Sequence, residues 1–220
     1  MSHTSRQQVV RVDREPEPLG EMHPVLLNLV NAAREYATAS DALLLSDYGY
    51  GAATPRLLTF IKSNGCLENK PIVVDSRYRI LEYEGATAAT PNEPEVEEAL
   101  GMTIGHDDPK LLLAGERLMK EMALDSLVIT RGRDGMVAFE KEMQPLAIPI
   151  HGSDQVVDVT GAGDTVIAAF TAALAAGADT VSAAQLANFA GGIVVMKRGT
   201  ATVTSKELLS AIDHYTATSA

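Results

Sequence analysis

The chain has 220 residues, 46% of them hydrophobic, which is enough to bury one substantial core and to form one domain. Acidic residues outnumber basic ones 29 to 18, and the net charge of −11 without a basic stripe argues against a nucleic-acid partner. The single cysteine, Cys66, excludes an intrachain disulfide and favours a reducing, cytoplasmic setting. The most apolar run, 166–178, is too short to cross a bilayer, so no membrane partner is expected.

The predicted elements begin with a strand over 6–13, which a Pro-rich stretch at 15–18 ends. Helices and short apolar strands then alternate: a helix over 23–39, a strand over 42–45, a helix over 54–64 and a strand over 71–74. A helix after Glu93, a helix over 109–123 and a strand over 126–130 follow. The chain closes with a hairpin over 136–139 and 146–148 and with helices over 163–176, 182–197 and 204–215.

This alternation predicts a mostly parallel sheet with helices on both faces. Ligands bind such sheets beyond the carboxyl ends of the strands. The sequence places polar residues at several of those ends: Asp47, Asp75, Thr90 to Asn92 and Thr130 to Gly132. Asp47 could contact a sugar or could be a buried turn carboxylate, and the pattern does not separate the two.

A glycine turn directly precedes the predicted helix over 163–176. The string Asp158-Val-Thr-Gly-Ala-Gly-Asp-Thr165 lets the backbone turn tightly and brings unpaired N–H groups to a helix start, which favours an anion. Asp164 in this turn could accept a proton from an attacking hydroxyl, or it could simply cap the helix. No Walker motif occurs, so an ordinary P-loop enzyme is excluded.

The same string resembles the C-terminal signature of the PfkB/ribokinase family of carbohydrate kinases. Further matches occur in the family's order and spacing, at 45–49, 90–95, 128–132 and 191–195. Within the family the chain is most similar to the kinase domain of bifunctional heptose 7-phosphate kinase/adenylyltransferases. The resemblance implies a ribokinase-like three-layer α/β/α fold and transfer of the γ-phosphoryl group of ATP to a sugar or sugar-phosphate hydroxyl, such as O1 of heptose 7-phosphate.

The resemblance also implies roles for individual residues. Asp164 would be the general base, and Gly161, Ala162 and Gly163 would form the anion hole for the transferring phosphoryl group. Asn92 and Glu95 match an N-x-x-E element that acts near Mg²⁺ and the phosphates, although Glu95 also belongs to an acidic run.

On the nucleotide side, Thr130, Gly132 and Gly135 match a turn along the phosphates of ATP or ADP, and the two glycines alone would be ordinary in a hairpin turn. Asn188 falls where the family contacts adenine or ribose; otherwise it is a helix residue pointing to solvent. Asp158 and Thr160 lie where many relatives hold a monovalent cation such as K⁺.

The family's N-terminal third has no counterpart in this sequence. Residues 1–20 resemble only the last lid strand and a linker, and 21–220 resemble the nucleotide-binding and catalytic domain. The truncated sheet is therefore expected to expose an edge, which a homodimer or a partner supplying the missing part would cover.

The sequence supports two candidate functions of different classes. The chain is a sugar kinase, or it is a non-catalytic nucleotide-binding remnant or subunit without its sugar site. A dinucleotide binder built on 49–54 is a weaker third interpretation, because the third glycine of that fingerprint is absent.

Overall fold

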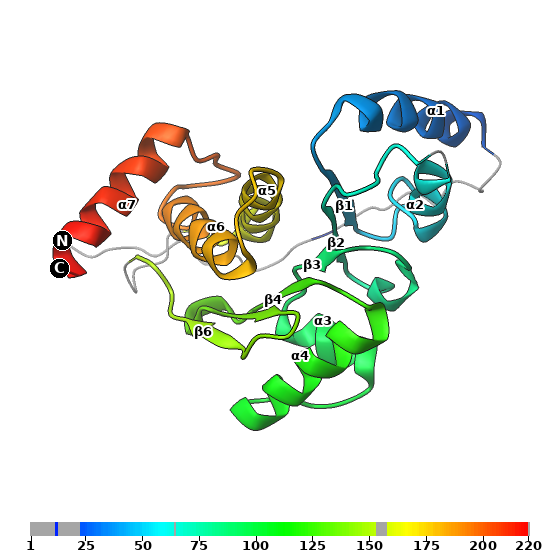
Figure 1. Ribbon diagram of the computed structural model, residues 1–220. Helices are drawn as coiled ribbons and strands as arrows, with labels where there is room; N and C mark the ends of the chain where they lie inside the picture. Colours follow the sequence, from blue (N-terminus) through cyan, green and yellow to red (C-terminus); the bar gives the residue numbers. More distant parts are fainter. Residues whose placement is uncertain (1–11, 13–22, 64, 153–157, 220) are drawn as a thin grey trace.

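The computed structural model describes residues 12, 23–63, 65–152 and 158–219 (Figure 1). The strand expected over 6–13 falls outside the described residues, Val12 apart. The first half of the described chain contains α1 (Pro24–Ala39), β1 (Leu43–Asp47), α2 (Pro55–Lys62), β2 (Ile72–Ser76), β3 (Ala88–Ala89), α3 (Glu93–Leu100) and α4 (Asp108–Met122). The second half contains β4 (Ser126–Thr130), β5 (Met136–Glu140), β6 (Leu146–Ile148), α5 (Ala162–Ala175), α6 (Thr180–Val194) and α7 (Ser205–Ser219).

The strands form one sheet in the order β1-β2-β3-β4-β5-β6. The pairs from β1 to β4 are parallel, and β5 and β6 continue the sheet as antiparallel strands. Asp47 pairs with Ser76 at the end of β1 and β2, so the carboxyl ends of these strands lie level at one edge. The sequence placed Thr90 to Asn92 at a strand end but did not give the bounds of β3, because two alanines are too short to show a strand period.

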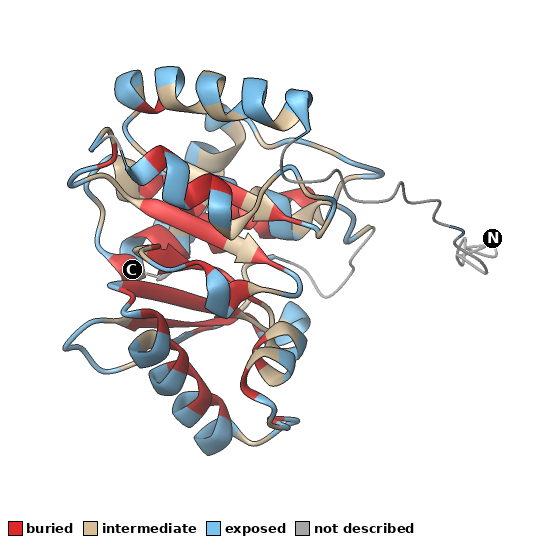
Figure 2. Ribbon diagram, turned by 90° about the vertical axis from the view of Figure 1, so that its right-hand side faces the viewer, coloured by how far each residue is buried: buried red, intermediate tan, exposed pale blue. Residues whose placement is uncertain are grey.

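Helices cover both faces of the sheet, which confirms the three-layer architecture. Side chains alternate across it: Val74, Leu127 and Ile129 join the core under α1 to α4. Val73, Val128 and Met136 join the core under α5 and α6. In Figure 1 the strands lie between α5 and α6 on one side and α3 and α4 on the other, and Figure 2 shows the strands as buried. Among the described residues, no helix combines the length and apolar composition needed to cross a bilayer.

Small residues let α6 approach its neighbours closely. A Cβ atom added at Gly191 would lie 2.9 Å from Cγ2 of Val166 on α5, and one added at Gly192 would collide with the His151 carbonyl oxygen. Close packing of this kind fixes the start of α5 against α6. The position of the glycine turn therefore depends on α6 as well as on α5.

At one side the sheet ends with β1, and within the described chain this strand pairs only with β2. Its outer edge carries the backbone groups that a further strand would use. The expectation of an exposed edge stays a prediction, because the strand expected over 6–13 lies outside the described residues, Val12 apart. What covers the edge remains a prediction.

Candidate active site

A cleft of about 190 Å³ opens at the carboxyl edge of the sheet, where the loops after β1, β2, β3 and β4 meet the start of α5. It is lined by Tyr48, Asp75, Thr90, Asn92, Glu95, Thr130, Gly161, Gly163, Asp164 and Val166. Most of the residues predicted for phosphate and proton chemistry are therefore brought together. The other predicted site residues do not line this cleft: Gly132, Gly135, Asp158, Thr160, Ala162 and Asn188.

The glycine turn forms the N-terminus of α5. Gly161 is the N-cap residue, with a φ of 77° that favours glycine, and its carbonyl accepts the Thr165 N–H at 3.0 Å. The N–H groups of Gly163 and Asp164 lie in the first turn, where a helix has no partner for its own donors. A Cβ atom at Gly163 would meet nothing within 4 Å, so there is open space beside this turn.

Asp164 does not cap α5 with its side chain, because the N-cap is Gly161 and no side-chain cap hydrogen bond is present. Instead, Asp164 Oδ1 accepts a hydrogen bond from the Tyr48 hydroxyl at 2.7 Å, and both side chains are exposed. This bond, followed by burial, raises the pKa of Tyr48 to about 12. The tyrosine therefore stays protonated, and remains a donor, at neutral pH.

Two further carboxyl groups line the cleft opposite Asp164. Burial, followed by the charges of Glu95 and Asp164, raises the pKa of Asp75 to about 7. Burial also raises the pKa of Glu95. Three acidic side chains in one cleft repel one another, so the site favours a proton among them.

Asn92 and Glu95 form the capping box of α3. The Asn92 side chain accepts the Glu95 N–H, and Glu95 Oε2 accepts the Asn92 N–H, each at 2.9 Å. The box holds both side chains at the cleft wall. Glu95 is thus more than one member of an acidic run.

The loop after β4 reaches the cleft through Thr130, whose N–H donates to the Pro91 carbonyl at 2.9 Å. At Gly132 a Cβ atom would meet nothing within 4 Å, so the turn is open there. At Gly135 a Cβ atom would collide with the Ile148 carbonyl oxygen, so this glycine is required by the β5–β6 hairpin. The two glycines therefore differ: hairpin packing accounts for Gly135 and not for Gly132.

Asn188 lies outside the cleft and is 8% exposed. Its Nδ2 donates to the Pro149 carbonyl at 2.7 Å, and its Oδ1 accepts the His151 N–H at 3.4 Å. The interpretation of a solvent-pointing helix residue is therefore wrong. The side chain ties the segment after β6 to α6, and a nucleotide contact stays a prediction.

Asp158 links two loops beside the glycine turn. Its carboxylate accepts the Thr160 N–H at 2.9 Å and the Gly199 N–H at 3.0 Å. Hydrogen bonding by the Thr160 side chain, followed by these two backbone bonds, lowers the pKa of Asp158. Among the described residues, no cluster of three His, Cys, Asp or Glu side chains could hold a metal ion.

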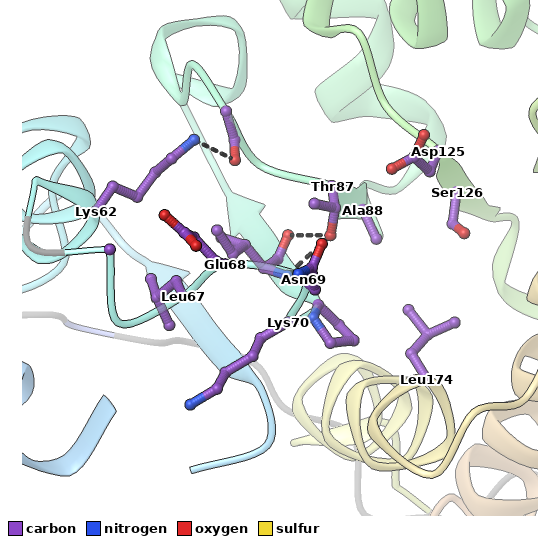
Figure 3. A pocket seen from close by; sticks show the side chains of 14 residues that line it. Lys62, Leu67, Glu68, Asn69, Lys70, Thr87, Ala88, Asp125, Ser126 and Leu174 are labelled. Carbon is purple, nitrogen blue, oxygen red and sulfur yellow. Dashed lines mark hydrogen bonds between the residues drawn. The ribbon is translucent and has the colours of Figure 1, made fainter. Parts of the chain in front are cut away.

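A larger cavity, about 590 Å³, lies at the opposite edge, by the amino ends of β2, β3 and β4 (Figure 3). Its two lysines are directed at backbone carbonyls: Lys62 Nζ donates to Gly85 at 2.9 Å, and Lys70 Nζ donates to Ala37 at 2.9 Å. Their hydrogen bonds close loops, so the cavity does not present them as free anion-binding groups. The smaller cleft is the better candidate site.

Comparison with known proteins decides the family. Residues 16–207 match the model of the pfkB family of carbohydrate kinases. The chain belongs to this family. The dinucleotide-binding interpretation of 49–54 is therefore discarded.

Relatives of this pfkB-family chain include bifunctional HldE proteins. That of Trichlorobacter lovleyi is 40% identical over 94% of the chain, and that of Proteus mirabilis is 38% identical over 94%. The chain spans only 42% of the length of either relative.

Solved structures agree on the ribokinase-like fold. Arabidopsis thaliana ribokinase, in complex with ribose and ATP, gives a TM-score of 0.71 at 21% identity, over 90% of this chain and 61% of that one. Escherichia coli phosphofructokinase-2, in complex with potassium, gives a TM-score of 0.72 at 16% identity, over 85% of this chain and 62% of that one. The ribokinase-like fold class expected from the sequence is confirmed.

Two cleft residues of this pfkB-family chain received no role from the sequence. Tyr48 lies within the matched segment 45–49, but nothing in that string shows its contact with Asp164, 116 positions away. Asp75 was placed at a strand end, and its position near Glu95 and Asp164 depends on how α3 and α5 lie relative to β2. Asp47, by contrast, proves to be the buried turn carboxylate, at 4% exposure.

Replacing Asp75 with asparagine is expected to stabilise the chain at alkaline pH. Asp75 ionises near pH 4 when unfolded and near pH 7 when folded, so its contribution to stability falls as pH rises through this window. With some solvent access to the side chain, Asp75→Asn should gain roughly 2 kcal/mol at pH 8 and progressively less towards pH 5. Urea unfolding at both pH values measures this. The exposed Asp41→Asn is the matched control, and an equal gain at both pH values would contradict the assignment.

Proposed function

We propose that the cleft carries out ATP-dependent phosphoryl transfer to a carbohydrate hydroxyl. The observation that carries the proposal is the first turn of α5, in which Gly161 and Gly163 line the cleft at the carboxyl edge of the sheet beside Asp164. A helix N-terminus attracts the negative charge of a phosphoryl group. A carboxylate in the same turn is suitably placed to take a proton from the attacking hydroxyl.

In this proposal each residue of the turn has one task. Asp164 is the general base, and the backbone of Gly161, Ala162 and Gly163 stabilises the transferring phosphoryl group. Such positioning and charge stabilisation supply most of the catalysis in phosphoryl transfer.

Mg²⁺ fits the opposite wall of the cleft. Its preferred ligands are oxygens, usually one or two carboxylates together with phosphates and water. Glu95 and Asn92 supply oxygens there, and Thr90 adds a buried hydroxyl that has no hydrogen-bond partner. Bound Mg²⁺ would neutralise charge on the phosphates and on Glu95.

The nucleotide itself is proposed to extend along Thr130, Gly132 and Gly135, with its adenine or ribose towards Asn188. Asp158 and Thr160 are proposed to adjoin a K⁺ site. The support is the position of Thr130 in the wall of the cleft and the hydrogen bonds of Asp158 to Thr160 and Gly199.

For the acceptor we propose a phosphorylated heptose, reacting at O1. The support is similarity to HldE proteins at about 40% identity. Because the chain spans 42% of their length, a non-catalytic nucleotide-binding role remains the second candidate.

The same proposal covers the organisation of the chain and its setting. Residues 21–220 would form the catalytic unit, and 1–20 a lid remnant and linker. The open edge of β1 would be covered in a homodimer or by a partner. The setting would be the cytoplasm, where Cys66 stays a free thiol.

Gly163→Ala is expected to change nucleotide affinity and stability in opposite directions. A methyl group there meets nothing in the folded chain and improves helix propensity, so the free energy of unfolding should rise by up to about 1 kcal/mol. The same methyl occupies space that a phosphoryl group needs, so affinity for Mg²⁺ with a non-hydrolysable ATP analogue should fall at least about tenfold, or 1.4 kcal/mol. Calorimetric titration and urea unfolding measure the two effects.

The control is Ala168→Ser, an exposed change farther along α5 that should leave affinity unchanged. Titrations with NAD and heptose 7-phosphate complete the test. Nucleotide binding without sugar binding would favour the non-catalytic role. Binding of NAD in place of ATP would remove both candidates.

A further inference from the structure

The hydroxyl of Tyr48 contacts Asp164 from the opposite wall of the cleft. Tyr48 follows β1, and Asp164 is in the first turn of α5, so the 2.7 Å hydrogen bond joins two walls that lie 116 residues apart in the sequence. It occupies Oδ1 of Asp164. The second oxygen, Oδ2, has no hydrogen bond recorded among the described residues.

The backbone at Tyr48 is held firmly. Asp47, immediately before it, accepts hydrogen bonds from Arg79, Ser76 and Tyr83. Gly49, immediately after it, has a φ of 85°, and a Cβ atom there would lie 3.3 Å from the Tyr78 ring. The tyrosine therefore extends from a fixed point, which is what a residue needs in order to fix another side chain.

The electrostatic surroundings leave Tyr48 as a donor to Asp164. Asp75 from β2 and Glu95 from α3 are the other titratable groups lining the cleft, and both are acids. The bond to Asp164 is the largest cause of the raised pKa of Tyr48, about 12. The phenol proton is thus retained throughout the neutral range.

We infer that Tyr48 is a positioning residue for Asp164: by donating to Oδ1 it fixes the carboxylate so that Oδ2 faces the acceptor hydroxyl. This inference rests on the proposed function, in which Asp164 takes the proton of that hydroxyl. The proton of the sugar hydroxyl passes to Oδ2 of Asp164. At the same time the sugar oxygen bonds to the γ-phosphorus, and the bond between this phosphorus and the ADP oxygen breaks. Tyr48 keeps its own proton throughout.

The first part of the test asks whether the contact exists in solution. Tyrosine labelled with ¹³C at Cζ is titrated by NMR from pH 8 to pH 11, and Tyr48→Phe identifies the signal. In the unaltered chain Tyr48 should remain un-ionised to pH 11, since its pKa is about 12. In the Asp164→Ala variant, Tyr48 should begin to ionise at a lower pH than in the unaltered chain. If the titration is the same in both chains, the contact is absent and the inference is overturned.

The second part asks what the contact does. Tyr48→Phe should lower kcat about tenfold, the effect of losing one hydrogen bond to a charged group, and leave KM for ATP within about twofold. Tyr36→Phe, an exposed change on α1, should alter neither. If Tyr48→Phe lowers the melting temperature but leaves kcat unchanged, the hydrogen bond serves stability alone and the inference is overturned. A chain that binds ATP but shows no turnover would overturn the proposed function, and the positioning role with it, even where the NMR contact is intact.

Discussion

Asp164→Asn is expected to lower the rate of ATP-dependent sugar phosphorylation by about a thousandfold. A positioned general base contributes roughly 10²- to 10⁴-fold, and a carboxamide of the same shape cannot accept the proton. The backbone N–H groups of Gly163 and Asp164 are unchanged, so affinity for Mg²⁺ with a non-hydrolysable ATP analogue should stay within about threefold. ADP release in a coupled assay and calorimetric titration measure the two quantities.

Asp213→Asn is the matched control, because Asp213 is an exposed carboxylate on α7, outside the cleft, and the change removes the same charge. It should keep full activity. Near-full turnover in Asp164→Asn would show that another group takes the proton. A loss of nucleotide affinity equal to the loss of rate would mean that Asp164 acts in binding instead.

The sequence was most informative where one local pattern decides the structure. The strand over 126–130 is observed as expected, because a short run with the apolar centre Leu-Val-Ile between turn signals has few alternatives. The start of α5 was also predictable, since two glycines followed by an alanine-rich stretch indicate a turn and then a helix. The common edge for Asp75, Asn92 and Thr130 followed from the rule for parallel strands.

The sequence was least informative where distant residues meet. The contact between Tyr48 and Asp164 depends on how β1 and α5 pack, and no periodic pattern reports it. Asn188 looked equally suited to solvent, because an asparagine within a helix reveals nothing of the loop at Pro149 that buries it. A contact of this kind depends on tertiary packing, so the sequence around one partner alone does not reveal it.

Asp47→Ala is expected to destabilise the chain by about 3 to 5 kcal/mol. Asp47 is 4% exposed, and its carboxylate accepts hydrogen bonds from Arg79 at 2.8 Å, from Tyr83 at 2.8 Å and from Ser76 at 3.0 Å. Tyr83 is fully buried, so its hydroxyl would lose its partner without gaining water. Urea unfolding, followed by circular dichroism, measures the free energy of unfolding.

The exposed Asp41→Ala is the control for loss of charge and should change stability by less than about 0.5 kcal/mol. Tyr83→Phe adds a sharper comparison: it should destabilise the unaltered chain but cost less in Asp47→Ala, where the hydroxyl is already unpaired. Equal costs in both chains would contradict the buried network. Because Asp47 directly precedes Tyr48, this network also fixes the backbone from which Tyr48 reaches Asp164. The buried carboxylate therefore supports the geometry of the proposed base without touching the substrate.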